Sequence, residues 1–324
     1  MLASDEIFRR NWERIREVDF DLKSKTNLYH AIIDLSGQPS YDEIWYKKDG
    51  GELYVKIHDV PGTLSGDILR LLAPLPSLTT HSEIKGNSIQ SIPNTPLVDV
   101  QDFEFPDQDT STVVLELPIT TFNEAIHFAK TSRCLSEVPN LLRAKGGPHI
   151  VELLGRTEDG LLVFPRYLDS RASSVLKGAD LSIAWLRRVL LQLAEALVFL
   201  HGQGIIHRDV AYRNVLISKD LQDVYLCDLE GAIGSDICPE IIAAGQVPPT
   251  QRPYTDKSDV YMFGITLTDF ILGNSTMNRW CYTSHWVPPA PFDVIAQACL
   301  KTAPYERPSM MEIRAMLEAI PVST

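Results

Sequence analysis

A strongly polar octapeptide lies between two long apolar segments in the second half of this 324-residue chain. It reads His207-Arg208-Asp209-Val210-Ala211-Tyr212-Arg213-Asn214. A second apolar helix is predicted after Asp259, ending at Gly273. Polar loops cost free energy unless their groups find partners, so a loop of this kind favours a functional site. The apolar segment before the octapeptide predicts a long helix with one apolar face, and this helix stops at Gly202 and Gly204. The residues of that face are Leu186, Val189, Leu190, Leu193, Leu197 and Leu200.

In spacing and context, the octapeptide matches the catalytic loop H-R-D-L-x-x-x-N of protein kinases. Three further motifs follow in the order that the family has them. Asp228 stands where the family has its metal-binding D-F-G, residues 256–264 (DKSDVYMFG) resemble the start of the central helix, and residues 306–310 (ERPSM) resemble the closing arginine motif. The chain thus resembles the protein kinase-like superfamily. The resemblance implies a bilobal α+β fold, with a small, divergent β-rich N-lobe and a larger, mainly α-helical C-lobe.

The resemblance also implies roles for individual side chains. Asp209 matches the base that orients the acceptor hydroxyl and takes its proton. Asn214 and Asp228 match the ligands of magnesium, which prefers hard oxygen atoms and would bind together with ATP. Arg213 occupies the catalytic-loop position where tyrosine kinases place a basic residue. Since phosphoryl transfer needs mainly positioning and charge neutralisation, these residue types suit an ATP-dependent kinase.

Other residues of the same half have expected structural roles. We expect His207 and Asp259 to form a hydrogen-bonded core, and Arg307 to pair with Glu240. That pairing aligns residues 238–240 (CPE) with the A-P-E motif of the family. An alternative places residues 248–250 (PPT) there, which restores the usual length of the segment but removes the glutamate.

The N-lobe departs from the family pattern, because no G-x-G-x-x-G sequence exists in the chain. If Glu137 is the helical glutamate that pairs with the nucleotide-binding lysine, two lysines compete for that role. Lys130 lies only seven residues before Glu137 (137 − 130 = 7), a spacing that we expect to be too short for a strand, a connection and a helical turn. Lys56 has a suitable strand setting and is the candidate if residues 60–110 are an insertion. In the D-F-G region, Glu230 replaces the usual glycine.

Residue patterns predict several local elements, here in chain order. Ser4 is expected to cap a helix to about Val18, with Ile7, Phe8, Trp12 and Ile15 on one side. Residues 43–57 predict a hairpin with its turn at residues 49–51 (DGG). Residues 111–117 (STVVLEL) predict a strand. Two capping boxes follow: Thr121 with Glu124, for a helix that Pro139 ends or kinks, and Ser309 with Glu312, for the last helix.

These elements suggest three domains: a helical extension over residues 1–24, the divergent N-lobe over 25–165, and the C-lobe over 166–324. The formal net charge of −12 argues against a nucleic-acid partner. No stretch approaches the ~20 apolar residues of a membrane span. The charged N-terminus, without a signal-like apolar run, and the five scattered cysteines favour an intracellular location, in the cytoplasm or the nucleus.

Three functions remain open on these observations. The first is a kinase-like phosphotransferase that acts on a protein serine, threonine or tyrosine. The second is a pseudokinase, a binding or scaffold module without nucleotide turnover. The third is a kinase-fold enzyme that acts on a small-molecule hydroxyl. The stretch between Asp259 and Arg307 favours it, because this stretch is short (307 − 259 = 48) and the family normally has a peptide-docking helix there. We expect the first.

Overall fold

The computed structural model describes residues 6–10, 13, 27–34, 41–48, 51–69, 72–95, 107–167, 182–231, 234, 237–245, 247, 251–272 and 287–321. The chain forms two compact units. One comprises Met1–Asp102 with Asn274–Asp293, and the other comprises Phe103–Gly273 with Val294–Thr324. This division differs from the expected domain boundaries, because residues 25–102 and residues 103–165 fall in different units.

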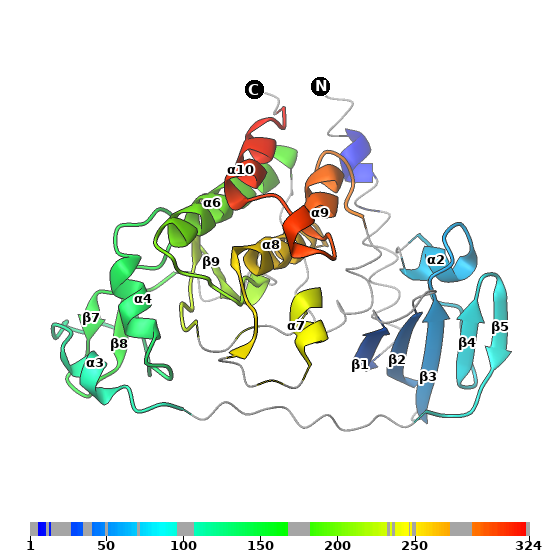
Figure 1. Cartoon of the computed structure of the whole chain (residues 1–324), viewed down its shortest axis with the longest axis horizontal. Coiled ribbons are helices and arrows are strands. Elements are labelled where there is room, and N and C mark those ends of the chain that lie inside the picture. Colours follow the sequence, from blue (N-terminus) through cyan, green and yellow to red (C-terminus); the bar gives the residue numbers. More distant parts are fainter. Residues whose placement is uncertain are drawn as a thin grey trace. The chain divides into compact units, whose positions relative to one another are not determined.

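The first unit contains a five-stranded sheet in the order β1-β2-β3-β4-β5 (Figure 1). Its strands are β1 (Asn27–Asp34), β2 (Tyr41–Lys48), β3 (Gly51–His58), β4 (Ser82–Lys85) and β5 (Ser88–Ser91). The predicted hairpin is confirmed, since β2 and β3 pair in antiparallel fashion up to Lys48 and Gly51; the other two turn residues lie outside the described part. Helix α2 (Leu64–Leu69) connects β3 to the parallel strand β4.

The expected N-terminal helix is described only in part. Residues 6–10 are helical, and the buried ring of Phe8 packs edge-on against Phe292 with the ring centroids 5.9 Å apart. Ile7, expected on the same side as Phe8, is exposed. Ser4, Trp12 and Ile15 lie outside the described residues.

The second unit begins with a small sheet and two short helices. The sheet has the order β6-β8-β7, formed by β6 (His127–Lys130), β7 (Gly155–Arg156) and β8 (Leu162–Pro165). The helices are α3 (Ser111–Leu115) and α4 (Glu137–Arg143). This β-rich part is small, and it lies in the same unit as the helical part that follows.

Two predictions for this region are wrong. The segment at residues 111–117 is a helix and not a strand, because Asp109 accepts a hydrogen bond from the Ser111 N–H and the chain turns at Thr110, whose carbonyl accepts from Val114. No helix follows Thr121. Instead Asn123 builds a tight turn by accepting the His127 N–H on its carbonyl, and the chain then runs on as β6, paired with β8.

The rest of the unit is mainly helical, as predicted. It contains α6 (Ile183–Gly202), α7 (Pro239–Ala244), α8 (Asp256–Leu272), α9 (Asp293–Cys299) and α10 (Met310–Glu318). Between α6 and α7 lie the 3-10 helix η1 (Tyr212–Asn214) and the hairpin of β9 (Val215–Ile217) with β10 (Val224–Leu226). A further 3-10 helix, η4 (Pro304–Glu306), precedes α10. No helix among these described residues is long and apolar enough to cross a membrane.

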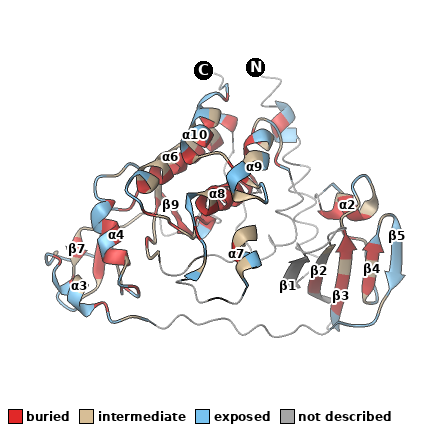
Figure 2. Cartoon of the chain, viewed as in Figure 1, coloured by how far each residue is buried: buried red, intermediate tan, exposed pale blue. Residues whose placement is uncertain are grey.

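Helix α6 is the centre of this helical part. All six predicted apolar residues of its face are buried, and Figure 2 shows α8 largely in the colour of buried residues and α6 in a mixture of the buried and intermediate colours. Ser182 caps its first turn by accepting the Trp185 N–H, and Gly204, at φ 68°, supports the chain reversal after it. The capping box of Ser309 and Glu312 is confirmed at the start of α10. This packing fixes the end of α6, and the polar octapeptide follows a few residues later.

Candidate active site

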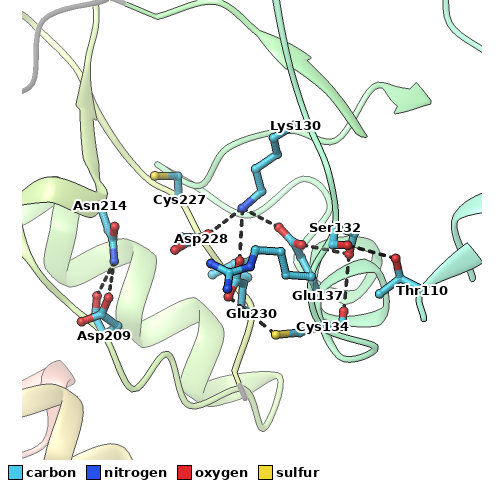
Figure 3. A network of polar contacts seen from close by, with 12 residues as sticks. Thr110, Lys130, Ser132, Cys134, Glu137, Asp209, Asn214, Cys227, Asp228 and Glu230 are labelled. Carbon is cyan, nitrogen blue, oxygen red and sulfur yellow. Dashed lines mark hydrogen bonds and ion pairs between the residues drawn. The ribbon is translucent and has the colours of Figure 1, made fainter. Parts of the chain in front are cut away.

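The catalytic loop follows α6 and holds the predicted base in a set of charge-assisted hydrogen bonds. Arg213 Nη2 donates to both carboxylate oxygens of Asp209, at 2.6 and 2.7 Å. Asn214 Nδ2 donates to the Asp209 carbonyl at 2.9 Å and to its Oδ2 at 2.8 Å. Because the amide nitrogen of Asn214 faces Asp209, its amide oxygen points away from it (Figure 3). That oxygen is therefore left to act as a ligand.

Buried Asp259, in the first turn of α8, positions the catalytic loop through hydrogen bonds to its backbone. Its two carboxylate oxygens accept the backbone N–H groups of His207 and Arg208, both at 2.8 Å. The His207 ring contacts the Cys227 carbonyl through Nε2 at 2.9 Å. These bonds confirm the hydrogen-bonded core expected of His207 and Asp259. They also hold Arg208 in the left-handed region, at φ 69°, where a residue with a side chain is strained.

Strand β10 brings Asp228 next to the catalytic loop. The Cys227 N–H donates to the Asn214 carbonyl at 2.9 Å and so joins the end of β10 to the catalytic loop. Asp228 follows with φ 70°, a second strained position. A carboxylate and an amide oxygen thus come from neighbouring segments, and both are hard oxygen donors of the kind that Mg²⁺ binds.

Lys130, at the end of β6, is the cation that lies between the carboxylates of the site. Its Nζ lies 2.6 Å from Asp228 Oδ1 and 2.9 Å from Glu137 Oε1 (Figure 3). Burial alone would lower the pKa of Lys130, but the charges of Glu137 and Asp228 outweigh burial and raise the pKa above its usual value. These two carboxylates therefore favour the charged form of the ammonium group. The prediction that Lys130 lies too close to Glu137 in sequence to pair with it is wrong.

The six-residue connection from Lys130 to Glu137 explains why this spacing suffices. Ser132 Oγ donates to Glu137 Oε2 at 3.0 Å, and the Cys134 carbonyl accepts the Glu137 N–H at 3.1 Å. Glu137 is the first residue of α4, so no helical turn has to be fitted before it. Pro139 lies within the first turn, where its missing N–H has no intrahelical partner to lose, and it does not break the helix.

Lys56, the predicted alternative, belongs to the other unit. It lies on β3 of the five-stranded sheet, and its Nζ is 3.5 Å from the centre of the Tyr41 ring. The structure assigns the contact with Glu137 and Asp228 to Lys130, and the nucleotide-binding role of Lys56 stays a prediction. The sequence signal for Lys130 was the segment HFAK, a short strand that ends in lysine directly before a helix that begins with glutamate.

Glu230 adds a third carboxylate around Lys130. Its Oε1 lies 3.6 Å from Lys130 Nζ, and its Oε2 accepts from the Cys134 thiol at 3.6 Å. The Glu230 carbonyl accepts a hydrogen bond from Ser136 Oγ. Burial and the nearby charge of Asp228 raise the pKa of Glu230, so its ionised form is disfavoured. The glutamate that replaces the family's glycine is thus tied to the connection before α4.

Arg307 and Glu240 form the predicted pair. Arg307 Nη1 and Nη2 donate to the two carboxylate oxygens of Glu240 at 2.9 and 2.8 Å, and the Arg307 side chain is fully buried. The arginine also donates to the carbonyls of Lys257, Lys301 and Thr302. This geometry favours the alignment of residues 238–240 with A-P-E; the alternative at residues 248–250 lies outside the described part.

A cleft of about 490 Å³, within the usual size range of small-ligand sites, lies beside Lys130, Asn214 and Asp228. Its lining includes the charged and polar residues Lys130, Glu137, Asn214, Asp228 and Arg213. The remainder is mostly apolar or aromatic and comprises Phe128, Leu141, Val151, Phe164, Pro165, Arg166, Tyr167, Val215, Leu216 and Cys227. Burial raises the pKa of the Cys227 thiol to about 12, with a further rise from Asp228, so the thiol stays protonated. The cleft thus combines charged and polar groups with a mostly apolar lining.

Comparison with known proteins agrees with this geometry. A model of the protein kinase domain matches residues 121–316, more than half of the chain. The chain is 29% identical over 163 residues to a probable serine/threonine-protein kinase of Dictyostelium discoideum (42% of this chain, 17% of the relative). It is 32% identical over 158 residues to a probable LRR receptor-like serine/threonine-protein kinase of Arabidopsis thaliana (43% and 16%). A serine/threonine-protein kinase-like protein of Arabidopsis thaliana is 29% identical over 153 residues (44% and 45%). The chain thus spans less than half the length of these curated relatives.

Proposed function

The chain belongs to the protein kinase family, and we propose that its cleft transfers the γ-phosphoryl group of ATP to a hydroxyl acceptor. The observation that supports this most is the joint contact of Lys130 with Glu137 and Asp228, because it completes the polar constellation that such a transfer needs. Lys130 would bind the phosphates, with Glu137 as the residue that positions its ammonium group. Lys130 also offsets the negative charges of Glu137 and Asp228, which by themselves would repel an anionic ligand.

The proposed chemistry assigns the remaining polar groups. Asn214 and Asp228 would hold Mg²⁺, which supplies charge neutralisation to the phosphates when it is bound. Asp209 accepts the proton of the acceptor hydroxyl as its oxygen forms a bond to the γ-phosphorus and the bond from that phosphorus to the bridging oxygen of ADP breaks. Arg213 holds the Asp209 carboxylate in place through its two hydrogen bonds. The relatives named above favour a protein serine or threonine as the acceptor, with a small-molecule hydroxyl as the alternative.

A pseudokinase remains the second candidate, and two observations favour it. The sequence holds no G-x-G-x-x-G loop to cover the phosphates, and the family match begins at residue 121, shortly before β6. In addition, Glu230 places a third carboxylate near Lys130, which disfavours a polyphosphate. In a pseudokinase the same cleft would be present, but it would not turn over a nucleotide.

A thermal-shift titration with ATP, with and without magnesium, tests the nucleotide site. A ligand at ~100 times its dissociation constant stabilises the folded state by about 2.7 kcal/mol, which this assay resolves. We expect a magnesium-dependent shift in the wild type that is lost in Asp228→Asn and kept in Asp159→Asn, which removes an exposed carboxylate that does not line the cleft. ADP release would be measured on the same samples. A shift without ADP release would favour the pseudokinase, and no shift at millimolar ATP would contradict the nucleotide site itself.

A further inference from the structure

Asn140 is a buried residue of α4 that contacts the segment directly after Asp228. Its Nδ2 donates to the Leu229 carbonyl at 2.9 Å, and its Oδ1 accepts from Arg143 Nη2 at 2.7 Å. Because a guanidinium group only donates, the bond to Arg143 requires the amide oxygen on that side and leaves the nitrogen facing Leu229. The buried amide is therefore hydrogen-bonded at both ends and held in one orientation.

Ser136, the residue before α4, makes a second contact of the same kind. Its Oγ donates to the carbonyl of Glu230. Leu229 and Glu230 are consecutive, so α4 and its N-cap hold the two successive carbonyls that follow Asp228. A carbonyl oxygen lies in the rigid plane of its peptide bond, so these two hydrogen bonds restrain both planes.

Gly231 lets α4 approach this segment closely. Its φ is 64°, in the left-handed region that favours glycine, and an added Cβ would lie 2.9 Å from Asn140 Nδ2. Any side chain at this position would therefore push against the amide of Asn140. A buried asparagine on α4 and a glycine three residues after Asp228 thus serve the same contact.

The conformation of Asp228 explains what this contact can do. Asp228 has φ 70°, and a strained conformation of this kind persists only when its surroundings hold it. On the N-terminal side, the Cys227 N–H donates to the Asn214 carbonyl at 2.9 Å. On the C-terminal side, the two carbonyl contacts with α4 have the same effect. The backbone of Asp228 is thus held on both sides, and the direction of its carboxylate with it.

We propose that Asn140 and Ser136 are positioning residues for Asp228, and that they hold its carboxylate in the geometry that magnesium needs. The proposal rests on the function proposed above and adds the groups that orient its metal ligand. Neither side chain lines the cleft, so both act through the Leu229 and Glu230 carbonyls and do not touch metal or nucleotide. Mg²⁺ demands near-ideal octahedral geometry, and loss of a group that orients a ligand typically weakens metal binding ~10- to 100-fold.

Asn140→Asp removes the proposed donor with the smallest change in shape. The carboxylate can still accept from Arg143, but it has no hydrogen to donate to the Leu229 carbonyl. Calorimetry measures the affinity for ATP over a series of free magnesium concentrations. We expect the half-saturating magnesium concentration to rise roughly 10- to 100-fold, with little change in the affinity for ATP without magnesium.

Three further variants control for charge, shape and position. Ser136→Ala removes the second donor without adding charge and should shift the magnesium dependence in the same direction, and it carries the test if Asn140→Asp does not fold. Ser136→Thr keeps the hydroxyl and should behave as the wild type does. Leu142→Ala is the matched control on α4, since Leu142 is 52% exposed and does not line the cleft.

A second readout needs neither metal nor turnover. In the metal-free protein, we expect the backbone amides of residues 229–231 to exchange hydrogen faster in Asn140→Asp than in the wild type. Exchange within α6, which belongs to the same unit, should stay the same.

The outcomes separate this inference from the proposed phosphoryl transfer. Magnesium dependence that stays at the wild-type value in both Asn140→Asp and Ser136→Ala would overturn the inference alone. An equal loss of ATP affinity at every magnesium concentration, or faster exchange throughout α6, would also overturn it, because the defect would then be general. A shifted magnesium dependence in a protein that releases no ADP would support the positioning role and refute the transfer. Wild-type ATP binding that is independent of magnesium would refute both the metal role of Asp228 and the inference.

Discussion

The Nζ atom of Lys130 lies 2.9 Å from Oε1 of Glu137, although only seven positions separate the two residues. The strand ends at the lysine and the helix starts at the glutamate, so the connection between them consists of residues 131–136 alone. Glu137 is buried and further fixed by Ser132, which leaves its charge directed at the lysine. The pair has the geometry of the ion pair by which kinases orient their nucleotide-binding lysine, with a shorter connection between strand and helix.

Replacing Lys130 by methionine should remove the cation that faces the phosphates. Charge-assisted hydrogen bonds contribute ~1.5–3 kcal/mol, so we expect ATP affinity to fall roughly 10- to 100-fold. Calorimetry with Mg²⁺ and ATP measures this directly. Lys56→Met is the control, since Lys56 contacts the Tyr41 ring in the other unit and should leave affinity unchanged. A loss of binding in the control and not in Lys130→Met would return the role to Lys56.

Replacing Glu230 by glutamine should have the opposite effect on nucleotide affinity. Burial and the charge of Asp228 already disfavour the ionised form of Glu230, as its raised pKa indicates. A neutral side chain of the same size keeps the space filled and removes the negative charge that Glu230 carries when it is ionised, which would repel the phosphates near Lys130. We expect ATP to bind tighter, by up to roughly tenfold or ~1.4 kcal/mol, in the same calorimetric assay. Weaker binding that extra magnesium restores would show instead that Glu230 helps to hold the metal.

Much of the helical half could be predicted from its sequence because strong local signals coincide there. The apolar face of α6 repeats at helical spacing, and the capping box at Ser309 and Glu312 is a local device. The pair of Arg307 with Glu240 was also predictable, because two motifs of the family supply one residue each. The structure adds what local signals do not contain, namely the convergence of β6, α4 and β10 on one cleft.

The small sheet was harder to predict because its elements are short and are decided by tertiary contacts. Residues 111–117 contain β-branched residues typical of strands, yet the turn at Asp109 and Thr110 makes them helical. β6 has only four residues and exists through its pairing with β8. Spacing typical of the family excluded Lys130, whereas the actual connection dispenses with any helical turn before Glu137.

Replacing Asp209 by asparagine should separate catalysis from binding. The carboxylate accepts hydrogen bonds from Arg213 and Asn214, and an amide of equal size keeps the space filled but cannot take the acceptor's proton. We expect the transfer rate, measured with a labelled γ-phosphate under single-turnover conditions, to fall by ~10²–10⁴-fold, with little change in the affinity for ATP. A collapse of ATP affinity would assign Asp209 a structural role.

Replacing Glu240 by glutamine should destabilise the protein in a pH-dependent way. Removal of one partner from a buried ion pair costs about 3–5 kcal/mol, and the carbonyls around Arg307 favour the lower end. Burial opposes the charge of Glu240, but hydrogen bonds from Arg307 prevail and lower its pKa below the usual 4.5. The ion pair therefore stabilises the folded protein fully above about pH 4.5, and this stabilisation is lost as the pH falls through the lower pKa that Glu240 has in the folded state. Urea unfolding at pH 7, 5 and 4 and at lower pH measures it, with exposed Glu318→Gln as a nearly neutral control. A difference between wild type and Glu240→Gln that persists undiminished well below pH 4 would show that the charge of Glu240 is not its cause.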